Sequence, residues 1–297
     1  MPRRLLQILI PAILLASCAG PGSPVPATVA TPPPTRVPTS TPTASLRAAN
    51  PPASSSPTIA PATPASTVAP APSATPRPWS LVVVGDSIPY NHPKDCPGCT
   101  GVATRYAAAI ELATGRDVTL TNVSEYTGLR VEGLLAGLTS DAVRRKVIAT
   151  ADFVLITIAH NNVVCLDWDL DRVTCATLAD QYRATYGQVF AEVVGLRAGR
   201  TTAYRTVNRY NDVTKPGATE GEAAGSKLIL DAWNEMVCAE AKAKGFLCAD
   251  IYHAFNGPDG LTPSGHLLAS DHTHPSDLGS ERIAEVLARL GYAPFWP

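Results

Sequence analysis

From residue 79 onward, apolar and polar residues follow two alternating patterns. Short runs of consecutive apolar, often β-branched residues are typical of buried strands, and they predict strands over 80–84, 118–123, 153–158, 202–207 and 246–251. Apolar residues at helical spacing predict helices over 102–112, 141–149, 176–196, 223–243 and 278–290. Because strands and helices alternate, we expect an α/β fold: a mainly parallel five-stranded sheet covered on both faces, in a three-layer α/β/α sandwich.

The N-terminal part of the chain shows neither pattern. Arg3 and Arg4 precede an apolar run that ends at Leu15-Ala16-Ser17-Cys18. This order is typical of a bacterial lipoprotein signal peptide in which Cys18 is lipidated, and an ordinary signal peptide with a chance cysteine is the alternative. Residues 19–78 hold seventeen of the 28 prolines and no Asp or Glu, so we expect a disordered or extended linker rich in Pro, Thr, Ser and Ala.

The sequence therefore divides into a signal peptide (1–18), a linker (19–78) and one domain (79–297). We expect the domain to lie outside the cytoplasm, in the cell envelope, with the lipid anchor as its only contact with the membrane. No later segment has 18 consecutive apolar residues, which excludes a polytopic membrane protein. All 25 Asp and Glu lie in the domain, and this mildly acidic balance argues against a nucleic-acid partner. A monomer is the default expectation.

Candidate chemistry follows the first predicted strand. In a parallel sheet, ligands bind beyond the carboxyl ends of the strands, so residues directly after each strand are the candidates for a site. Gly85-Asp86-Ser87 would place a serine hydroxyl at a sharp strand-to-helix turn, although this tripeptide alone favours a helix cap or a turn. A serine also needs a base before it can act as a nucleophile.

A candidate base lies near the other end of the chain, before the last predicted helix. Asp271 and His274 are three residues apart, so the carboxylate can orient the imidazole while the other ring nitrogen takes the proton of Ser87. The alternative is an acidic helix cap with solvent-exposed histidines.

Two further predicted strands end in groups that could bind an oxyanion. Gly128 follows the second strand and Asn161 the third, and their N–H groups could stabilise negative charge on a bound substrate. Gly133 is a rival to Gly128. Gly128 also fits a turn, and Asn161 also fits a helix or loop cap. Asp86, His160 and Asn162 flank these residues and are candidates for substrate contact.

Taken together, these motifs resemble those of the GDSL-type, or SGNH, hydrolases. The resemblance lies in Gly85-Asp86-Ser87-Ile88 and in Asp271-x-x-His274-Pro275. It implies a flavodoxin-like fold, no metal, no cofactor, and cleavage of acyl esters by Ser87, His274 and Asp271. It also implies an oxyanion hole formed by the Ser87 N–H, the Gly128 N–H and the Asn161 amide. The third block departs from the family's usual Gly-x-Asn-Asp, because it has alanine at 159 and asparagine at 162.

The cysteines after Cys18 fall into three local couples. Cys165–Cys175 and Cys238–Cys248 are each ten residues apart, and Cys96-Pro-Gly-Cys99 forms a tight turn. In an exported protein we expect all three couples to form disulfides, because the compartment is oxidising. Cys96 and Cys99 could instead be labile thiols or half of a metal site. They lie in the segment 89–100, which could form a lid or a rim beside the site.

These expectations lead to one leading hypothesis and one alternative. The first is an extracytoplasmic serine esterase that acts on short-chain or O-acetyl esters, either linked to a polysaccharide or lipid-like. The second is a non-catalytic carbohydrate-binding or surface-interaction module on the same fold. The two differ in whether Ser87 and His274 lie within hydrogen-bonding distance, with Asp271 behind the histidine.

Overall fold

The structure is a computed structural model that describes residues 76–162, 172–215 and 217–297. The predicted signal peptide with Cys18, and the linker up to residue 75, lie outside the described residues. No helix in the described part of the chain has both the length and the apolar character needed to cross a membrane.

Five parallel strands form one sheet, as the alternation of strands and helices predicts. They are β1 (Trp79–Gly85), β2 (Val118–Asn122), β3 (Phe153–Thr157), β4 (Ala203–Val207) and β5 (Leu247–Ala249). Their order is β2-β1-β3-β4-β5, the flavodoxin-like order, which reverses its direction between β1 and β3. Ligands bind at such a switch point, so the carboxyl ends of β1 and β3 are where a site is expected.

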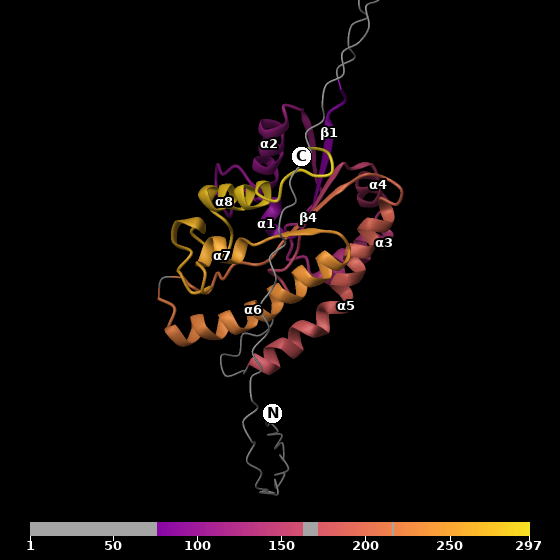
Figure 1. The fold of residues 1–297 in the computed structure, drawn as a ribbon. Helices are drawn as coiled ribbons and strands as arrows, with labels where there is room; N and C mark the ends of the chain where they lie inside the picture. The colour runs from indigo at the N-terminus through magenta and orange to yellow at the C-terminus, as the bar shows by residue number, and fades with distance from the viewer. Residues whose placement is uncertain (1–75, 163–171, 216) are drawn as a thin grey trace, which may run out of the picture. The chain divides into compact units, whose positions relative to one another are not determined.

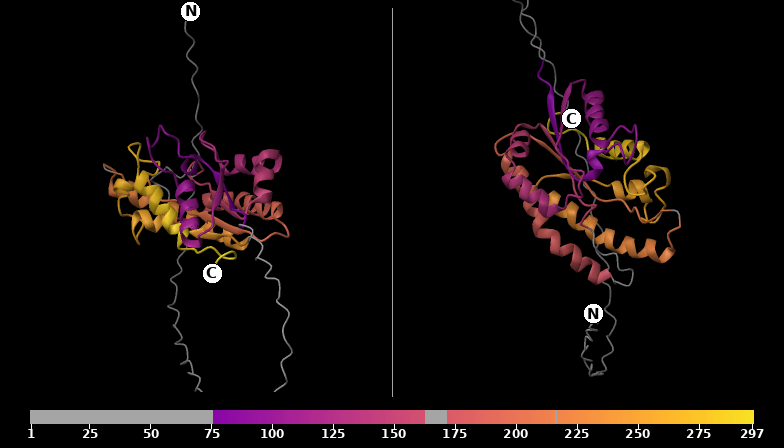
Figure 2. Two further views of the ribbon diagram at one scale, coloured as in Figure 1. Left: turned by 90° about the horizontal axis from the view of Figure 1, so that it is seen from above. Right: turned by 180° about the vertical axis from the view of Figure 1, so that it is seen from behind.

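Helices cover both faces of this sheet (Figure 1). The helices α2 (Val102–Thr114), α7 (Ile251–Asn256) and α8 (Asp277–Ala288) pack on one face. The helices α3 (Val131–Ser140), α4 (Ala142–Thr150), α5 (Arg172–Leu196) and α6 (Glu220–Ala243) pack on the other. Figure 2 shows the two groups separated by the sheet from behind as well.

The side chains of the central strands alternate between the two cores. Leu81 and Val83 of β1 join the core beneath α2 and α8, whereas Val82 and Val84 join the core beneath α3, α5 and α6. Every second residue of a strand points to the same face, so a run that is apolar throughout belongs to a strand buried on both sides. This is the pattern that marked β1 and β3 in the sequence.

The structure differs from the sequence-based prediction at two helices. Helix α3 was not predicted, although Val131, Leu134 and Leu138 are buried at helical spacing, because Gly133 and Gly137 lower its intrinsic helix propensity. The predicted strand 246–251 is shorter, since Asp250 caps a new helix, α7, by accepting a hydrogen bond from the N–H of His253.

Two disulfides lie in the described residues. Cys96 pairs with Cys99 in the loop before α2, and Cys238 of α6 pairs with Cys248 of β5. Both couples agree with the pairing expected from local spacing. The third predicted couple involves Cys165, which lies outside the described residues, and its other member, Cys175, is buried near the start of α5.

Candidate active site

The turn after β1 is built so that Ser87 stands at the carboxyl edge of the sheet. Gly85 pairs with Thr157 of β3, and a Cβ atom at Gly85 would lie 2.0 Å from the Thr157 carbonyl oxygen. Only glycine allows this close approach of the two backbones. Ser87 then begins the short helix α1 (Ser87–Tyr90) and is nearly buried.

Asp86 connects the ends of two neighbouring strands. Its side chain is buried and accepts hydrogen bonds from the N–H of Ile88 at 3.0 Å and from those of Ala159 and His160, both at 3.3 Å. Burial raises the pKa of this carboxyl despite those N–H groups and the nearby charge of Arg209. In this structure the carboxyl of Asp86 ties the end of β1 to the end of β3, and the expected substrate contact at Asp86 stays a prediction.

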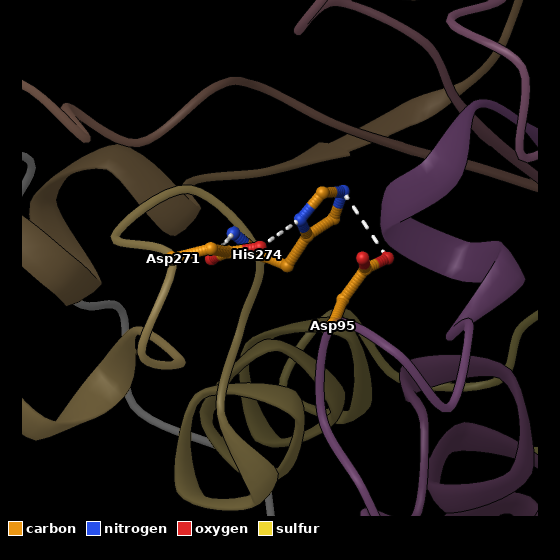
Figure 3. A group of neighbouring side chains, drawn as sticks. All are labelled: Asp95, Asp271 and His274. Atoms are coloured by element: carbon orange, nitrogen blue, oxygen red, sulfur yellow. Dashed lines mark hydrogen bonds and ion pairs between the residues drawn. The ribbon is translucent and has the colours of Figure 1, made fainter.

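His274 lies between Ser87 and Asp271. Its Nε2 lies 2.9 Å from Ser87 Oγ, and its Nδ1 lies 2.6 Å from Asp271 Oδ2 (Figure 3 shows the histidine–aspartate pair). The structure thus brings together all three residues that the sequence singled out for nucleophilic chemistry. The distances fit a proton path from the serine to an imidazole held by a carboxylate.

The loop before α8 holds this histidine in place. Asp271 Oδ1 accepts hydrogen bonds from the N–H groups of Thr273 and His274, at 2.9 and 3.0 Å. Tyr210 donates its hydroxyl hydrogen to the Thr273 carbonyl at 2.6 Å. Burial alone would raise the pKa of Asp271, but the two N–H groups and the His274 ring outweigh it and lower the pKa below its usual value. The carboxylate is therefore ionised at neutral pH.

The two expected oxyanion residues lie beside each other. Gly128 has a φ of +73°, and a Cβ atom there would lie 3.9 Å from Asn161 Oδ1. Asn161 donates one Nδ2–H to the Leu129 carbonyl at 3.0 Å. A primary amide carries two such hydrogens, so the second remains available to a ligand. The rival glycine, Gly133, lies inside α3, away from a strand end.

Asn162, in contrast, is occupied by the fold. Its side chain is fully buried, its Oδ1 accepts from the N–H of Val131 at 2.7 Å, and its Nδ2 donates to Glu132 at 3.0 Å. The first turn of a helix leaves N–H groups without partners, and Asn162 satisfies one of these for α3. Asn162 thus ties the loop that carries Asn161 to the start of α3, and the expected substrate contact at Asn162 stays a prediction.

His160 packs against Tyr210, with 4.6 Å between the centroids of the two rings. Burial, together with the charges of Arg209 and His274, lowers its pKa well below the usual value, so the ring is neutral. It lines a cavity of about 10 Å³ with Asp86, Ile88 and other residues. That volume is close to the space that one water molecule needs.

Sequence reasoning missed Asp95, which lies in the segment 89–100. Its Oδ2 lies 3.6 Å from His274 Nε2, on the opposite side of the ring from Asp271 (Figure 3). The Tyr126 hydroxyl donates to its Oδ1 at 3.3 Å, and Tyr126 also stacks on His92 at 3.9 Å between ring centroids. The segment was expected as a lid or rim, but no spacing in the sequence connects Asp95 with the histidine 179 positions later.

Asp95, Asp271 and His274 are also the described residues to consider for a metal ion, because their ligand atoms lie within 4.8 Å of one another. The two carboxylates face opposite edges of the imidazole, however. A cation bound by all three would need the ring to move from between them, so the group does not converge on one point. The arrangement fits acid–base chemistry at His274 better than metal binding.

Comparisons with known proteins agree with this geometry. The model of the family described as GDSL-like lipase/acylhydrolase matches residues 83–282, more than half of the chain. The lipase Lip_vut3 from a goat rumen metagenome has a similar structure, with a TM-score of 0.60 and 19% sequence identity over 73% of this chain and 99% of that one.

The acetylxylan esterase Axe2 from Geobacillus stearothermophilus is a second similar structure, with a TM-score of 0.50 and 20% identity over 71% of this chain and 93% of that one. No curated protein matches the chain. At these identities the structural neighbours support the fold, whereas the family match covers the blocks with Ser87, Gly128, Asn161 and His274. The chain therefore belongs to the GDSL-like lipase/acylhydrolase family and is a hydrolase.

Proposed function

We propose that the protein is a serine esterase whose triad is Ser87, His274 and Asp271. The observation that carries this proposal is the continuous contact from Ser87 Oγ through the His274 ring to Asp271, at 2.9 and 2.6 Å. A serine, a base within hydrogen-bonding distance and a carboxylate that fixes the ring form the arrangement that activates a nucleophile.

In the proposed reaction, His274 Nε2 takes the proton of Ser87 as Oγ attacks the acyl carbonyl. Negative charge then develops on the carbonyl oxygen, where the N–H groups of Ser87, Gly128 and Asn161 stabilise it. The bond to the alcohol breaks, and His274 returns the proton to the leaving oxygen. Water, deprotonated by His274, cleaves the acyl-enzyme and releases the carboxylic acid and free Ser87.

We propose acetyl or similarly small esters as substrates, because no long apolar run borders the motifs of the site in the sequence. The acetyl groups of a polysaccharide are one such class, and the similar fold of an acetylxylan esterase favours testing them first.

The proposed location is the cell envelope, outside the cytoplasm. The sequence around Cys18 supports a lipid anchor, and residues 19–78 have the composition of a tether. The disulfides Cys96–Cys99 and Cys238–Cys248 are consistent with an oxidising compartment. Metabolic labelling with a fatty-acid analogue tests this part, because a Cys18→Ser variant should lose the label.

A fluorophosphonate probe tests the proposed activity directly. We expect covalent labelling at Ser87, mapped by mass spectrometry, and loss of labelling in Ser87→Ala and His274→Ala. His266→Ala is a matched control, because His266 is an exposed histidine before the same loop and lies outside the proposed triad. Absence of labelling in a folded protein would support the alternative, a non-catalytic binding module, and glycan binding would then be measured.

A further inference from the structure

Asp95 places a second carboxylate at the reactive edge of His274. The edge of the ring that carries Nε2 faces both Ser87 Oγ at 2.9 Å and Asp95 Oδ2 at 3.6 Å. The second distance is too long for a hydrogen bond, so Asp95 lies beside the proton path without closing it. A proposed Ser–His–Asp triad requires only Asp271, which leaves the position of Asp95 unexplained.

The Asp95 carboxylate accepts one hydrogen bond and has one unused oxygen. The side chain of Asp95 is only 13% exposed. Its Oδ1 accepts a hydrogen bond from the Tyr126 hydroxyl, whereas its Oδ2 is buried and has no hydrogen-bond partner among the described residues. A desolvated carboxylate oxygen without a donor is costly, so a ligand that supplies a donor would be bound preferentially.

The surrounding loop keeps this oxygen in place. The N–H of Asp95 donates to the His92 carbonyl, and the disulfide Cys96–Cys99 follows directly in the chain. The ring of His92 stacks on that of Tyr126, whose hydroxyl holds Oδ1. Tyr126 in turn begins the turn that contains Gly128, so the Asp95 loop and the proposed oxyanion loop support each other.

The position of Oδ2 defines the part of a substrate that it can reach. When the acyl-enzyme forms, His274 Nε2 gives its proton to the leaving alcohol oxygen, so that oxygen lies within hydrogen-bonding distance of Nε2. Asp95 Oδ2 flanks the same nitrogen. A hydroxyl on the neighbouring carbon of the alcohol would therefore lie next to Oδ2.

We propose that Asp95 is a specificity-determining residue that accepts a hydrogen bond from a free hydroxyl adjacent to the ester, on the leaving alcohol. The preferred substrates are then partially acylated polyols, in which an acyl group has a free hydroxyl as its neighbour. This inference rests on the proposed esterase function and adds a substrate feature to it.

A matched pair of esters tests the proposal on the full-length protein. 2-Hydroxyethyl acetate carries the neighbouring hydroxyl, and propyl acetate replaces it with a methyl group of similar size. 2-Methoxyethyl acetate keeps the oxygen but lacks the donor hydrogen. We expect wild-type kcat/KM to be about 10- to 100-fold higher for the hydroxyl ester than for the other two, the range expected when a hydrogen bond to a charged group is lost.

The variants Asp95→Asn and Asp95→Ala identify the residue responsible. We expect the Ala variant to lose the preference, by lowering kcat/KM for the hydroxyl ester alone, and the Asn variant to weaken it. Tyr126→Phe removes the hydroxyl that holds Oδ1 and should weaken the preference without removing the carboxylate. Asp117→Asn is the matched control, because Asp117 is exposed and precedes β2 at the opposite edge of the sheet.

A direct effect of Asp95 on His274 would give a different pattern of rates. If Asp95 acted on the His274 imidazolium, its replacement would lower kcat/KM equally for all three esters and would slow labelling by a fluorophosphonate, which carries no neighbouring hydroxyl. That outcome overturns the proposal, and so does a wild-type protein without preference. If the wild type cleaves propyl acetate and is labelled at Ser87, failure of the preference leaves the esterase function intact. If the wild-type protein neither cleaves these esters nor is labelled at Ser87, the esterase function and the role of Asp95 are both overturned.

Discussion

Asn161 and Asn162 are neighbours in the chain, but their side chains bind different partners. Asn161 donates to the carbonyl of Leu129, beside Gly128 and the proposed oxyanion position. Asn162 is fully buried and accepts from the N–H of Val131 at the start of α3. One asparagine is thus free to contact a substrate with its second amide hydrogen, while the other is used to hold the fold.

This division predicts opposite effects of two matched alanine variants. Asn161→Ala should lower kcat by about 10² to 10³, the usual effect of removing one oxyanion donor, with little loss of stability. Asn162→Ala should lower the free energy of unfolding by about 1–3 kcal/mol, because the Val131 N–H loses its buried partner. Urea denaturation and steady-state kinetics of both variants test this. Equal loss of stability in the two would contradict it.

The contact between Asp271 and His274 predicts the effect of an isosteric change. In Asp271→Asn, the side-chain amide can donate a hydrogen bond to Nδ1, where the carboxylate of the wild type accepts one. This change favours the tautomer of His274 with its proton on Nε2. That tautomer cannot accept the proton of Ser87, so kcat should fall by about 10⁴, as in other Ser–His–Asp enzymes. The Asp117→Asn control should retain wild-type kcat. An Asp271→Asn variant within about tenfold of wild type would exclude the proposed role of Asp271.

A third prediction concerns the amino edge of the sheet, opposite the site. Asp152 is buried and accepts two hydrogen bonds from Arg77, both at 2.7 Å, and one from the N–H of Ser80 at 2.9 Å. Asp152→Asn should lower the free energy of unfolding by about 1–2 kcal/mol at neutral pH, a modest figure because Arg77 is 67% exposed and its charge is screened.

The pKa of Asp152 predicts how the difference in unfolding free energy between wild type and Asp152→Asn depends on pH. Burial by itself would raise the pKa of Asp152, but Arg77 and the Ser80 N–H outweigh it and lower the pKa below 3.8. A folded-state pKa below the unfolded value stabilises the protein above the unfolded pKa, and this stabilisation is lost as pH falls through the folded pKa. The difference between wild type and Asp152→Asn should therefore shrink below about pH 4. A difference that is constant with pH would contradict this.

The last prediction concerns the disulfide between α6 and β5. Cys238–Cys248 closes a loop with a sequence separation of 10, so replacing both cysteines by serine should lower the free energy of unfolding by about 2–3 kcal/mol. Cys96–Cys99 has a separation of only 3 and lies in a loop, so the matched double serine variant should lose less. Chemical denaturation of the two variants tests the order, and a reducing agent should abolish the advantage of the wild type.

Most of the sheet could be predicted because its strands carry a strong local signal. The apolar runs that form β1 and β3 lie within one or two residues of the predicted bounds. Helix α3 could not be predicted as easily, because its glycines weaken the local preference and its buried face is stabilised by packing against other elements, among them α5 and the sheet. Tertiary packing overrides propensity in such elements.

The candidate site shows the same division between local pattern and tertiary contact. Ser87, Asp271 and His274 could be singled out from the sequence, because the motif around each one has a recognisable form and follows a predicted strand or precedes a predicted helix. The parallel sheet then brings Ser87 and His274, 187 positions apart, to 2.9 Å. The expectation that these motifs lie at the carboxyl edge of a parallel sheet was enough to place them on the same side.

Side-chain roles within each motif were decided only by the tertiary structure. The sequence marks Asp86 and Asn162 only as neighbours of the site, whereas the fold buries both side chains and uses their oxygens to accept from backbone N–H groups. Asp95 carries no motif, but the loop closed by Cys96 and Cys99 brings it to the reactive edge of His274. Hydrophobic pattern and motif spacing are local properties of a chain, whereas burial and the choice of hydrogen-bond partner exist only after distant segments have packed.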